Sequence, residues 1–366
     1  GAIADGRRRR PVHPTGSRDH MRILLAGASG SLGSYLVREF LQDGHQVYAL
    51  MHRKAPQEDS VTCIQGDVTL PRFGIQGALP QVDAIVNAAG LVSFNNRDRQ
   101  ALERVNVYGV INAANVAREL NVIFFHISTA YICGDYKGII RPNDLNVGQT
   151  HRNAYEWSKF QAEQQIRGWK DDLSWVIFRP SILVGDSKVW GIPPLHGLYV
   201  GVRGVYLTKR WLERKLALPR LAPVLRLKAD PCATINLIPV DIAARQIADV
   251  VLKTDKDHLV VTGKNPIYPI VNTQPPTITQ VFAAAGTALG AQIVPCLSFD
   301  PNPAERVLER LLRDLLPYLQ GEPIFAPNPS WPAPASELIP PGFVEQTTRL
   351  FLLNHTVEAQ NVAEPG

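Results

Sequence analysis

The sequence lacks any long hydrophobic run. No stretch of about eighteen consecutive apolar residues occurs, and the first residues carry none of the apolar core that a secretory signal needs. We therefore expect a chain that neither spans nor crosses a membrane, and we expect a cytoplasmic location.

Cysteine is scarce as well. The four cysteines are scattered without the short spacing of a zinc site, at Cys63, Cys133, Cys232 and Cys296. Their density is also too low for a disulfide scaffold. These observations predict packing roles for the thiols in a reducing compartment, and no bound metal.

Most of the net positive charge lies in the first twenty residues. The 366 residues include 38 basic and 33 acidic side chains, which give a formal net charge of +5. Residues 1–20 hold five arginines and two aspartates and so contribute +3. The remainder is close to neutral, which argues against a nucleic-acid partner, although the run Arg7–Arg10 could bind phosphates. We expect a disordered basic leader over residues 1–20 and a folded chain from Met21.

Short apolar runs alternate with helical stretches from Met21 onward. The run Arg22–Ala26 is followed by a glycine turn, an amphipathic helix that stops at Gly44, and a second run at Gln46–Met51. Further runs occur at Ala84–Asn87, Val122–Ile127 and Trp175–Phe178. Runs that are apolar throughout are typical of strands buried on both faces. The sequence therefore predicts an α/β fold with a doubly wound, parallel Rossmann sheet.

The pattern changes beyond the last of these runs and suggests two domains. We place an NAD(P)-binding Rossmann domain at residues 21–270, with an insertion of helices and loops at about 190–235, where Leu, Val, Arg and Pro are frequent. Residues 271–366 are expected to complete a smaller, mainly helical or irregular substrate lobe and its tail.

Individual elements are also expected in the second half of the chain. The core should resume with a strand at Thr234–Pro239 and a helix from Asp241. A helix is predicted at Ala304–Leu319, and the proline-rich sequence from Pro323 predicts an irregular tail.

Three glycines stand directly between the first predicted strand and the first helix, at Gly27, Gly30 and Gly33. In a GxxGxxG turn the missing side chains permit a tight bend and let backbone N–H groups approach a pyrophosphate at the helix N-terminus. A glycine triplet can also be ordinary turn chemistry, but the strand before it and the helix after it indicate a dinucleotide site. The other residues of this turn expected to contact the cofactor are Ser29, Ser31 and Leu32.

The end of the second predicted strand bears on the choice between NAD(H) and NADP(H). A carboxylate there would bond the ribose 2′-OH and repel a 2′-phosphate. The place is taken by Met51, and three further cofactor-contact candidates follow it, His52, Arg53 and Lys54. Without a carboxylate and with two cations, the electrostatics favour NADP(H), while NAD(H) stays possible because both cations could be solvated loop charges.

A further acidic residue, Asp67, follows the third predicted strand, with Val68 after it. Its carboxylate is placed to accept a hydrogen bond from an adenine amino group. The same residue could equally serve as a turn or cap residue.

Tyr155 and Lys159 are four residues apart and therefore share one face of a predicted helix. An ammonium beside a phenol, aided by a positive nicotinamide ring, stabilises the phenolate and is expected to lower the pKa of the tyrosine. Such a tyrosine can donate or accept a proton near neutral pH.

Two hydroxyl residues, Ser128 and Thr129, stand at the end of an earlier predicted strand. A hydroxyl in that place can donate a hydrogen bond to a substrate carbonyl oxygen and support the oxyanion that develops during hydride attack. We prefer Thr129 because of its position before Gly134; alternatively, one of the two residues only caps the turn.

Seven motifs in order resemble the extended short-chain dehydrogenase/reductase superfamily over roughly residues 21–250. They are the glycine triplet, Asp67, Asn87-Ala88-Ala89-Gly90, Asn106-Val107-Tyr108-Gly109, Ser128-Thr129-Ala130-Tyr131, the Tyr155 and Lys159 pair, and Arg179-Pro180-Ser181.

The resemblance implies roles for these residues. Tyr155 would be the general acid/base, Lys159 would orient the nicotinamide ribose and tune Tyr155, and Thr129 would supply the catalytic hydroxyl. Asn106 would help to hold the active-site helix. The residues that would line the cofactor are Asn87, Ala88, Ala89, Gly90, Pro180 and Ser181.

Within that superfamily the chain is most similar to the fatty acyl reductase (male sterility) and thioester reductase branch, which reduces acyl-CoA or carrier-bound thioesters to aldehydes or alcohols. The likeness lies in the phrases Gly66–Val68, Phe73–Ile75, Val92–Phe94, His126–Tyr131, Phe178–Ser187 and Ile235–Asp241. His52 stands where this branch often has arginine, with Arg53 one place later.

The resemblance implies an NADPH-dependent oxidoreductase that reduces a carbonyl or an acyl thioester, with acyl-CoA or an acyl carrier protein as partner. Leu-, Val- and Pro-rich sequence at residues 190–235 and 300–350 suits an apolar substrate, or a lobe that only covers the cleft. Two alternatives stay open: a nucleotide-sugar epimerase or dehydratase or ketone reductase of specialised metabolism, and a non-catalytic dinucleotide-binding protein.

Overall fold

The computed structural model describes residues 20–52, 55, 56, 58–169, 172–189, 197–257, 259, 265–329 and 339–361, with side chains up to Asn354. The predicted basic leader, apart from His20, lies outside the described residues. So do Arg53 and Lys54, the two cations on which the NADP(H) prediction partly rests.

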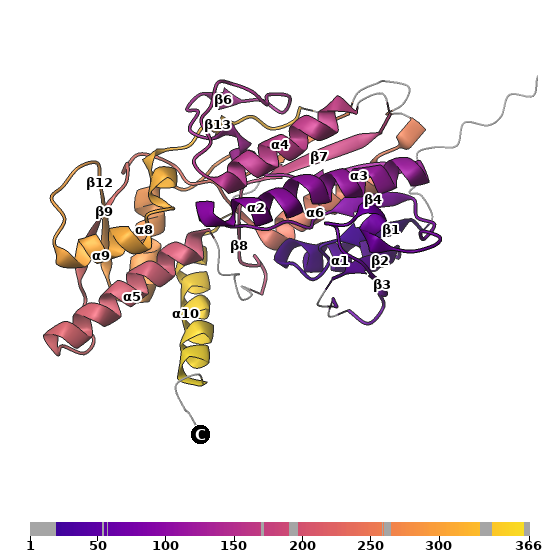
Figure 1. Ribbon diagram of the computed structural model, residues 1–366. Helices are drawn as coiled ribbons and strands as arrows, with labels where there is room; N and C mark the ends of the chain where they lie inside the picture. Colours follow the sequence, from indigo (N-terminus) through magenta and orange to yellow (C-terminus); the bar gives the residue numbers. More distant parts are fainter. Residues whose placement is uncertain are drawn as a thin grey trace, which may run out of the picture.

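A seven-stranded parallel sheet forms the centre of the first lobe, in the order β11-β7-β5-β4-β1-β2-β3, with the second lobe beside it (Figure 1). Its strands are β1 (Arg22–Ala26), β2 (Gln46–Met51), β3 (Thr62–Gln65), β4 (Ala84–Asn87), β5 (Ile123–Ile127), β7 (Trp175–Pro180) and β11 (Ile267–Ile270). The chain runs outward from β1 to β3 and then returns to β4 on the other side of β1. In parallel sheets this reversal opens a crevice at the carboxyl ends of the strands, where ligands bind.

Helices cover both faces of this sheet. Ile23, Leu25 and Val86 point to one face and pack with α1 (Ser31–Gln42) and α6 (Val240–Lys253). Leu24 and Ile85 point to the other and pack with α3 (Gly109–Leu120) and α4 (Ala154–Gly168). Both faces of the central strands β1, β4, β5 and β7 are therefore buried, as the continuous hydrophobic runs predicted, whereas the edge strand β3 is largely exposed. The prediction of a doubly wound Rossmann fold is confirmed.

Short helical turns connect these elements. They are η1 (Pro71–Gly74), η2 (Asn96–Asp98), α2 (Arg99–Leu102), the π-helical turn η3 (Glu103–Tyr108) and η4 (Ala130–Cys133). The turns η3 and η4 lie next to α4. They border the site described below.

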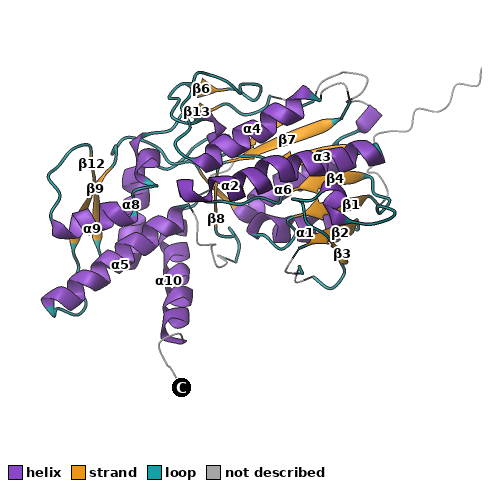
Figure 2. Ribbon diagram, in the orientation of Figure 1, coloured by secondary structure: helices purple, strands orange, loops and turns teal. Residues whose placement is uncertain are grey.

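A second lobe is mostly helical (Figure 2). It has its own hydrophobic core. Its helices are α5 (Leu198–Leu216), α8 (Ile278–Leu289), α9 (Pro303–Leu311), η5 (Leu316–Gln320) and α10 (Phe343–Asn361), and its strands β9 (Val224–Lys228) and β12 (Gln292–Cys296) pair in parallel. Two small parallel pairs lie at the junction with the first lobe. They are β8 (Ile182–Val184) with β10 (Leu237–Pro239), and β6 (Ile139–Ile140) with β13 (Ile324–Phe325).

Three of the predicted boundaries in this half are wrong. The expected helix Ala304–Leu319 is broken after Leu311, and Pro317 lies in the first turn of η5, where its missing N–H does no harm. The expected strand Thr234–Pro239 is reduced to β10, because Thr234 instead forms an isolated bridge with Thr277. The predicted insertion of helices and loops also contains a strand, β9.

The predicted irregular tail is wrong as well, because α10 lies within it. Phe343, Thr347 and Phe351 are buried and recur every four residues, which is the spacing of one helix face. The ring of Phe351 stacks on that of Tyr199 from α5, with centroids 5.3 Å apart. Among the helices that the structure describes, neither α10 nor any other is both long and apolar enough to traverse a bilayer.

A buried ion pair fixes α4 to β7. Arg179 is 1% exposed and donates from Nε and Nη2 to the Glu163 carboxylate at 2.9 and 2.7 Å. Its Nη1 and Nη2 also donate to the carbonyl oxygens of Pro142 and Asp144, at 3.0 and 2.8 Å. Burial alone would raise the pKa of Glu163, but the charges of Arg179 and Arg167 hold that pKa below its ordinary value.

Removing this carboxylate would leave Arg179 buried without a counter-charge. We expect Glu163→Ala to lower the free energy of unfolding by about 3–5 kcal/mol at pH 7. Glu345→Ala, which breaks an exposed pair with Arg349, should change it by less than about 1 kcal/mol. Urea unfolding measures both, and equal losses would contradict the assignment.

The same ion pair predicts a pH dependence. Because the folded-state pKa of Glu163 is below its ordinary value of 4.5, its stabilisation is complete above pH 4.5 and is lost as the pH falls through the folded-state pKa. The difference in the free energy of unfolding between wild type and Glu163→Ala should therefore become smaller below pH 4.5 and stay constant between pH 5 and 7.

Candidate active site

One cavity joins the carboxyl edge of the sheet to the interior of the second lobe. Its volume is about 310 Å³. The glycine turn lines one end, and Thr129, Tyr155 and Lys159 line the middle. The far end is aliphatic and is lined by residues that include Val202, Val205, Leu227, Val281, Leu289 and Leu312.

The glycine turn leaves no room for side chains at two of its positions. Gly27 has φ +86°, and a Cβ there would lie 2.6 Å from the backbone of Ala88 and Ala89. A Cβ on Gly33 would lie 1.9 Å from the carbonyl oxygen of Gly27. The turn can therefore form only with glycine at both places.

The N-terminus of α1 opens onto the cavity. Gly30 is the N-cap residue and supplies no side-chain cap, so the first N–H groups of α1 keep their capacity to bind an anion. Ser29 is exposed at this turn and Ser31 lines the cavity, whereas the side chain of Leu32 is largely buried in the core as well as lining it. This arrangement fits the pyrophosphate of a dinucleotide.

The end of β2 lies beside the end of β1, because Leu50 pairs with Ala26. Met51 therefore stands close to the glycine turn, and the next residue, His52, places its Nε2 3.3 Å from Oδ2 of Asp67. The other carboxylate oxygen of Asp67 accepts from the N–H of Thr69 at 2.8 Å. Asp67 thus makes the turn contact that we considered as the alternative to adenine binding, and one oxygen faces His52.

Val68 and the end of β4 complete this side of the site. The carbonyl oxygen of Val68 accepts from Nδ2 of Asn112 at 2.9 Å, which anchors the loop after β3 to α3. Asn87 is buried, and its Oδ1 has no hydrogen-bond partner among the described residues. Ala88 and Gly90 line the cavity, while Ala89 packs against the core under α3.

Helix α4 carries Tyr155 and Lys159 into the cavity. Asn153 caps its N-terminus, since Oδ1 accepts from the N–H of Glu156 at 3.0 Å. Nζ of Lys159 donates to the carbonyl oxygen of Ile127, the last residue of β5, at 3.0 Å. The lysine can come this close because its neighbour is Gly90, where a Cβ would lie 3.1 Å from Nζ.

Burial controls the pKa of both residues. It raises the pKa of Tyr155 to about 12, although a hydrogen bond with Thr129 opposes the shift; the charge of Glu156 adds to it. It also lowers the pKa of Lys159 to about 8, against the attraction of Glu163. Lys159 is not among the groups that shift Tyr155. In this structure the pKa of Tyr155 therefore lies above its ordinary value, because burial penalises the phenolate. The expected lowering, which counts on a positive nicotinamide ring beside the phenol, stays a prediction.

Of the two hydroxyl candidates, Thr129 is the one that lies with the phenol. Its Oγ1 donates to the carbonyl oxygen of Pro180 at 3.5 Å and accepts from the N–H of Tyr131 at 3.3 Å, and its hydroxyl lies near enough to Tyr155 to lower the pKa of the phenol. Ser128 also lines the cavity, but its hydroxyl lies near Glu163. Ser181, at the end of β7, is buried and its N–H donates to the carbonyl oxygen of Ile270 at 3.0 Å.

Asn106 lies in the π-helical turn η3 and connects the loop after β4 to α4. Its Nδ2 donates to the carbonyl oxygen of Leu91 at 2.9 Å and to Oγ of Ser158 at 3.0 Å. Its Oδ1 accepts from the N–H of Leu91 at 2.8 Å. These contacts suit a residue that holds the helix of Tyr155 in place.

Three aromatic side chains around Tyr155 were not predicted from the sequence. The rings of Phe94 and Tyr318 stack with centroids 5.3 Å apart, and Phe94 lies 6.0 Å from the ring of Tyr155. Tyr131 packs edge-on against Tyr318 at 5.6 Å. Phe94 and Tyr131 occur in motifs that we quoted, but Tyr318 comes from η5 in the second lobe, and no local pattern connects it with Tyr155.

The lowered pKa of Lys159 predicts a stability change that depends on pH. Below pH 8 the buried ammonium destabilises the folded state, and this cost disappears as the pH rises from about 8 to the ordinary value of 10.5. Since the bond to Ile127 is lost as well, we expect Lys159→Met to raise the free energy of unfolding by about 1–2 kcal/mol at pH 7.

The measurement is urea unfolding at pH 7 and again near pH 10.5. The increase in the free energy of unfolding caused by Lys159→Met should vanish at the higher pH. The control is Lys188→Met, which changes a surface lysine and should not increase the free energy of unfolding at either pH. If Lys159→Met instead lowers the free energy of unfolding at pH 7, the prediction is contradicted, because the contacts of the ammonium would then outweigh the cost of burying its charge.

Comparison with known proteins identifies relatives of this chain. Residues 56–247, just over half of it, match the family model described as Male sterility protein, an NAD-binding domain; the match begins beyond the glycine turn. The probable fatty acyl-CoA reductase 4 of Arabidopsis thaliana is 21% identical over 293 residues, which cover 64% of this chain and 56% of that protein. The chain thus spans about half the length, or less, of the first curated relatives that it matches.

Solved structures share the fold. The terminal R domain from the myxalamid PKS-NRPS biosynthetic pathway has a TM-score of 0.67 at 18% identity, over 96% of this chain and 94% of that one. A UDP-galactose 4-epimerase has a TM-score of 0.61 at 15% identity, over 92% and 99%. At such identities the likeness establishes the fold and nothing more. The family match extends over more than half of the residues, and by it the chain belongs to the Male sterility protein family of NAD-binding proteins, the branch that its motifs predicted.

Proposed function

We propose that this chain is an NADPH-dependent reductase of acyl thioesters, presented as acyl-CoA or on a carrier, with an aldehyde or alcohol as product. The observation that supports it most is the single cavity, in which the glycine turn, the Thr129 and Tyr155 hydroxyls and a long aliphatic lining are continuous. A fatty acyl-CoA reductase among the relatives and an R domain among the structures with this fold agree with it.

In this proposal the hydroxyls of Thr129 and Tyr155 bind the carbonyl oxygen of the substrate. When bound, the reduced nicotinamide supplies the hydride that attacks the carbonyl carbon. A phenol whose pKa is about 12 holds its proton at neutral pH, so Tyr155 can donate that proton to the developing oxyanion. A thioester then releases its thiol and leaves the aldehyde, and Lys159 would orient the ribose beside Tyr155.

The aliphatic end of the cavity would hold the acyl chain. Among the described lining residues, Lys159 is the one with an ionisable amine or carboxylate, and it lies at the nicotinamide end. Burying an alkyl chain here gains roughly 0.8 kcal/mol per methylene group. A nucleotide sugar would instead need polar partners for its diphosphate and hydroxyl groups, so this lining disfavours the epimerase alternative. The presence of Tyr155, Thr129 and Lys159 together in one cavity disfavours a non-catalytic binding protein.

We also propose the division of the chain into a cofactor domain at residues 21–270 and a substrate lobe built from the insertion at about 190–235 and the segment 271–366. Helix α5 from the insertion and α8 from the final segment both line the aliphatic end of the cavity, which supports this division.

NADP(H) preference should depend on the uncharged residue at the end of β2. We expect Met51→Asp to lower the ratio of kcat/KM for NADPH over that for NADH about 10-fold or more, because a carboxylate bonds the ribose 2′-OH and repels a 2′-phosphate. Steady-state kinetics with both cofactors measure the ratio, and Met51→Leu should preserve it. A wild-type enzyme that prefers NADH would contradict the proposed cofactor.

The activity itself is tested by NADPH oxidation with acyl-CoA, acyl-carrier, aldehyde, ketone and nucleotide-sugar substrates. We expect turnover of acyl thioesters, and a fall in kcat of about 10²–10⁴-fold in Tyr155→Phe with NADPH binding retained. Tyr108→Phe, which changes an exposed tyrosine, should behave as wild type. Full turnover by Tyr155→Phe, or turnover of nucleotide sugars alone, would overturn the proposal.

A further inference from the structure

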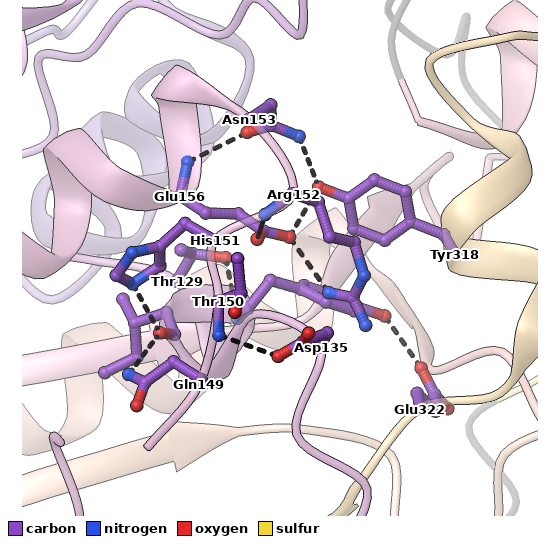
Figure 3. A network of polar contacts seen from close by, with 12 residues as sticks. Thr129, Asp135, Gln149, Thr150, His151, Arg152, Asn153, Glu156, Tyr318 and Glu322 are labelled. Carbon is purple, nitrogen blue, oxygen red and sulfur yellow. Dashed lines mark hydrogen bonds and ion pairs between the residues drawn. The ribbon is translucent and has the colours of Figure 1, made fainter. Parts of the chain in front are cut away.

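Tyr318 connects the second lobe to the first turn of α4 (Figure 3). Its hydroxyl donates to Oε1 of Glu156 at 2.6 Å and accepts from Nδ2 of Asn153 at 2.8 Å. Asn153 and Glu156 lie on either side of Tyr155 in the sequence, and the N-cap residue Asn153 accepts from the N–H of Glu156 in the first turn of α4. The hydroxyl of Tyr318 therefore binds the two residues that fix the backbone at Tyr155.

Glu156 is fully buried, so its carboxylate depends on hydrogen bonds from the protein in place of water. Oε2 accepts from the N–H of Arg152 at 2.8 Å, and Oε1 accepts from Nη1 of the same arginine at 3.0 Å. Burial and then the charge of Glu156 hold the pKa of Tyr318 far above its ordinary value. Tyr318 consequently stays protonated and remains a hydrogen-bond donor to the carboxylate.

The ring of Tyr318 lies on the cavity side of this contact. It lines the cavity, stacks on Phe94, and carries the guanidinium of Arg152 4.8 Å from its centroid. Leu315 and Leu319, which precede and follow it, line the aliphatic end. One short segment of the second lobe therefore touches both the proposed acyl site and the cap of the helix that carries Tyr155.

Neighbouring contacts hold this segment firmly against the first lobe. The hydroxyl of Tyr131 donates to Oε2 of Glu322 at 2.8 Å, and Nζ of Lys137 donates to the carbonyl oxygens of Gln320 and Gly321 at 2.9 and 2.6 Å. The pairing of β6 with β13 follows directly. Because the chain directly after Tyr318 is anchored to the first lobe by these contacts, the hydroxyl of Tyr318 has a fixed place relative to α4.

We propose that Tyr318 is a positioning residue for the reduction, through which the second lobe sets where the Tyr155 phenol stands relative to the acyl carbonyl. The inference rests on the proposed function, since it concerns the same reaction. Tyr318 acts through Glu156 and Asn153 and gives up no proton. Its effect is on the placement of the proton donor, and a displacement of a fraction of an ångström is enough to slow such a transfer.

The direct test is Tyr318→Phe in the full chain, which keeps the ring and its stacking but removes both hydrogen bonds. We expect kcat to fall about 10–100-fold, with KM for acyl-CoA and for a long-chain aldehyde within about 3-fold and the Kd for NADPH unchanged. The matched control is Tyr206→Phe, because Tyr206 packs against the second-lobe core without lining the cavity. It should keep wild-type kinetics.

A double-mutant cycle separates positioning from general damage to the fold. If Tyr318 acts through Glu156, the variant Y318F/E156Q should have about the same kcat as the slower single variant. The inference would be overturned if the losses of kcat in the two single variants add up in the double variant. It would also be overturned if KM and the Kd for NADPH rise together in Tyr318→Phe. Wild-type kcat in Tyr318→Phe would overturn it even where Tyr155→Phe is inactive.

The same assays distinguish this failure from failure of the proposed function. If wild type reduces aldehydes but no thioester, the thioester proposal fails while the comparison of Tyr318→Phe with wild type still decides the inference. If Tyr155→Phe keeps full turnover, the chemistry assigned to Tyr155 fails and the positioning role fails with it.

Discussion

The attachment of α4 to the strand ends is the constraint on which the site depends. The helix is held by buried polar contacts as well as by its apolar face: Lys159 bonds the main chain of β5, Glu163 pairs with Arg179 of β7, and Ser158 accepts from Asn106. Such contacts cost desolvation energy and add little net stability. Their effect is geometric, because apolar packing tolerates small sliding movements and directed hydrogen bonds do not.

The cavity places these polar groups at the edge of a region of low dielectric. The same enclosure that raises the pKa of Tyr155 and lowers that of Lys159 strengthens every hydrogen bond offered to a substrate oxygen. Beyond Tyr155 the walls become aliphatic. The change from polar to aliphatic walls defines where a reacting carbonyl and an alkyl chain would each lie, and the aromatic rings of Phe94, Tyr131 and Tyr318 stand at that change.

Much of the first lobe could be predicted from the sequence because its signals are local. The strands β1, β2, β4, β5 and β7 appear as apolar runs, the turn at Gly27 and Gly33 follows from backbone sterics, and the helical spacing of Tyr155 and Lys159 places both on one face. The preference for Thr129 over Ser128 stays a prediction, although Thr129 is the one of the two whose hydroxyl influences the pKa of Tyr155. Cofactor preference stays a prediction, because Arg53 and Lys54 lie outside the described residues.

The second lobe was harder to predict, for reasons that the structure makes plain. The break before Pro317 and the helix α10 within proline-rich sequence depend on packing between distant segments, which no window of neighbouring residues reports. The pKa of Tyr155 moves opposite to expectation because burial, the largest influence on it, cannot be read from residue spacing. Tyr318 and Glu156 are 162 residues apart in the sequence. No pattern of neighbouring residues could therefore predict the contact between them that Figure 3 shows.

The second lobe is assembled from two separate stretches of chain, and this has a consequence for the order of folding. Helix α5 is synthesised before β11 completes the central sheet, yet its core partners α8, α9 and α10 are synthesised afterwards. Domains generally acquire structure as their residues emerge during synthesis. The nucleotide cradle therefore has all its parts early, whereas the acyl cavity and the hydrogen bonds of Tyr318 belong to the last contacts that the molecule can make.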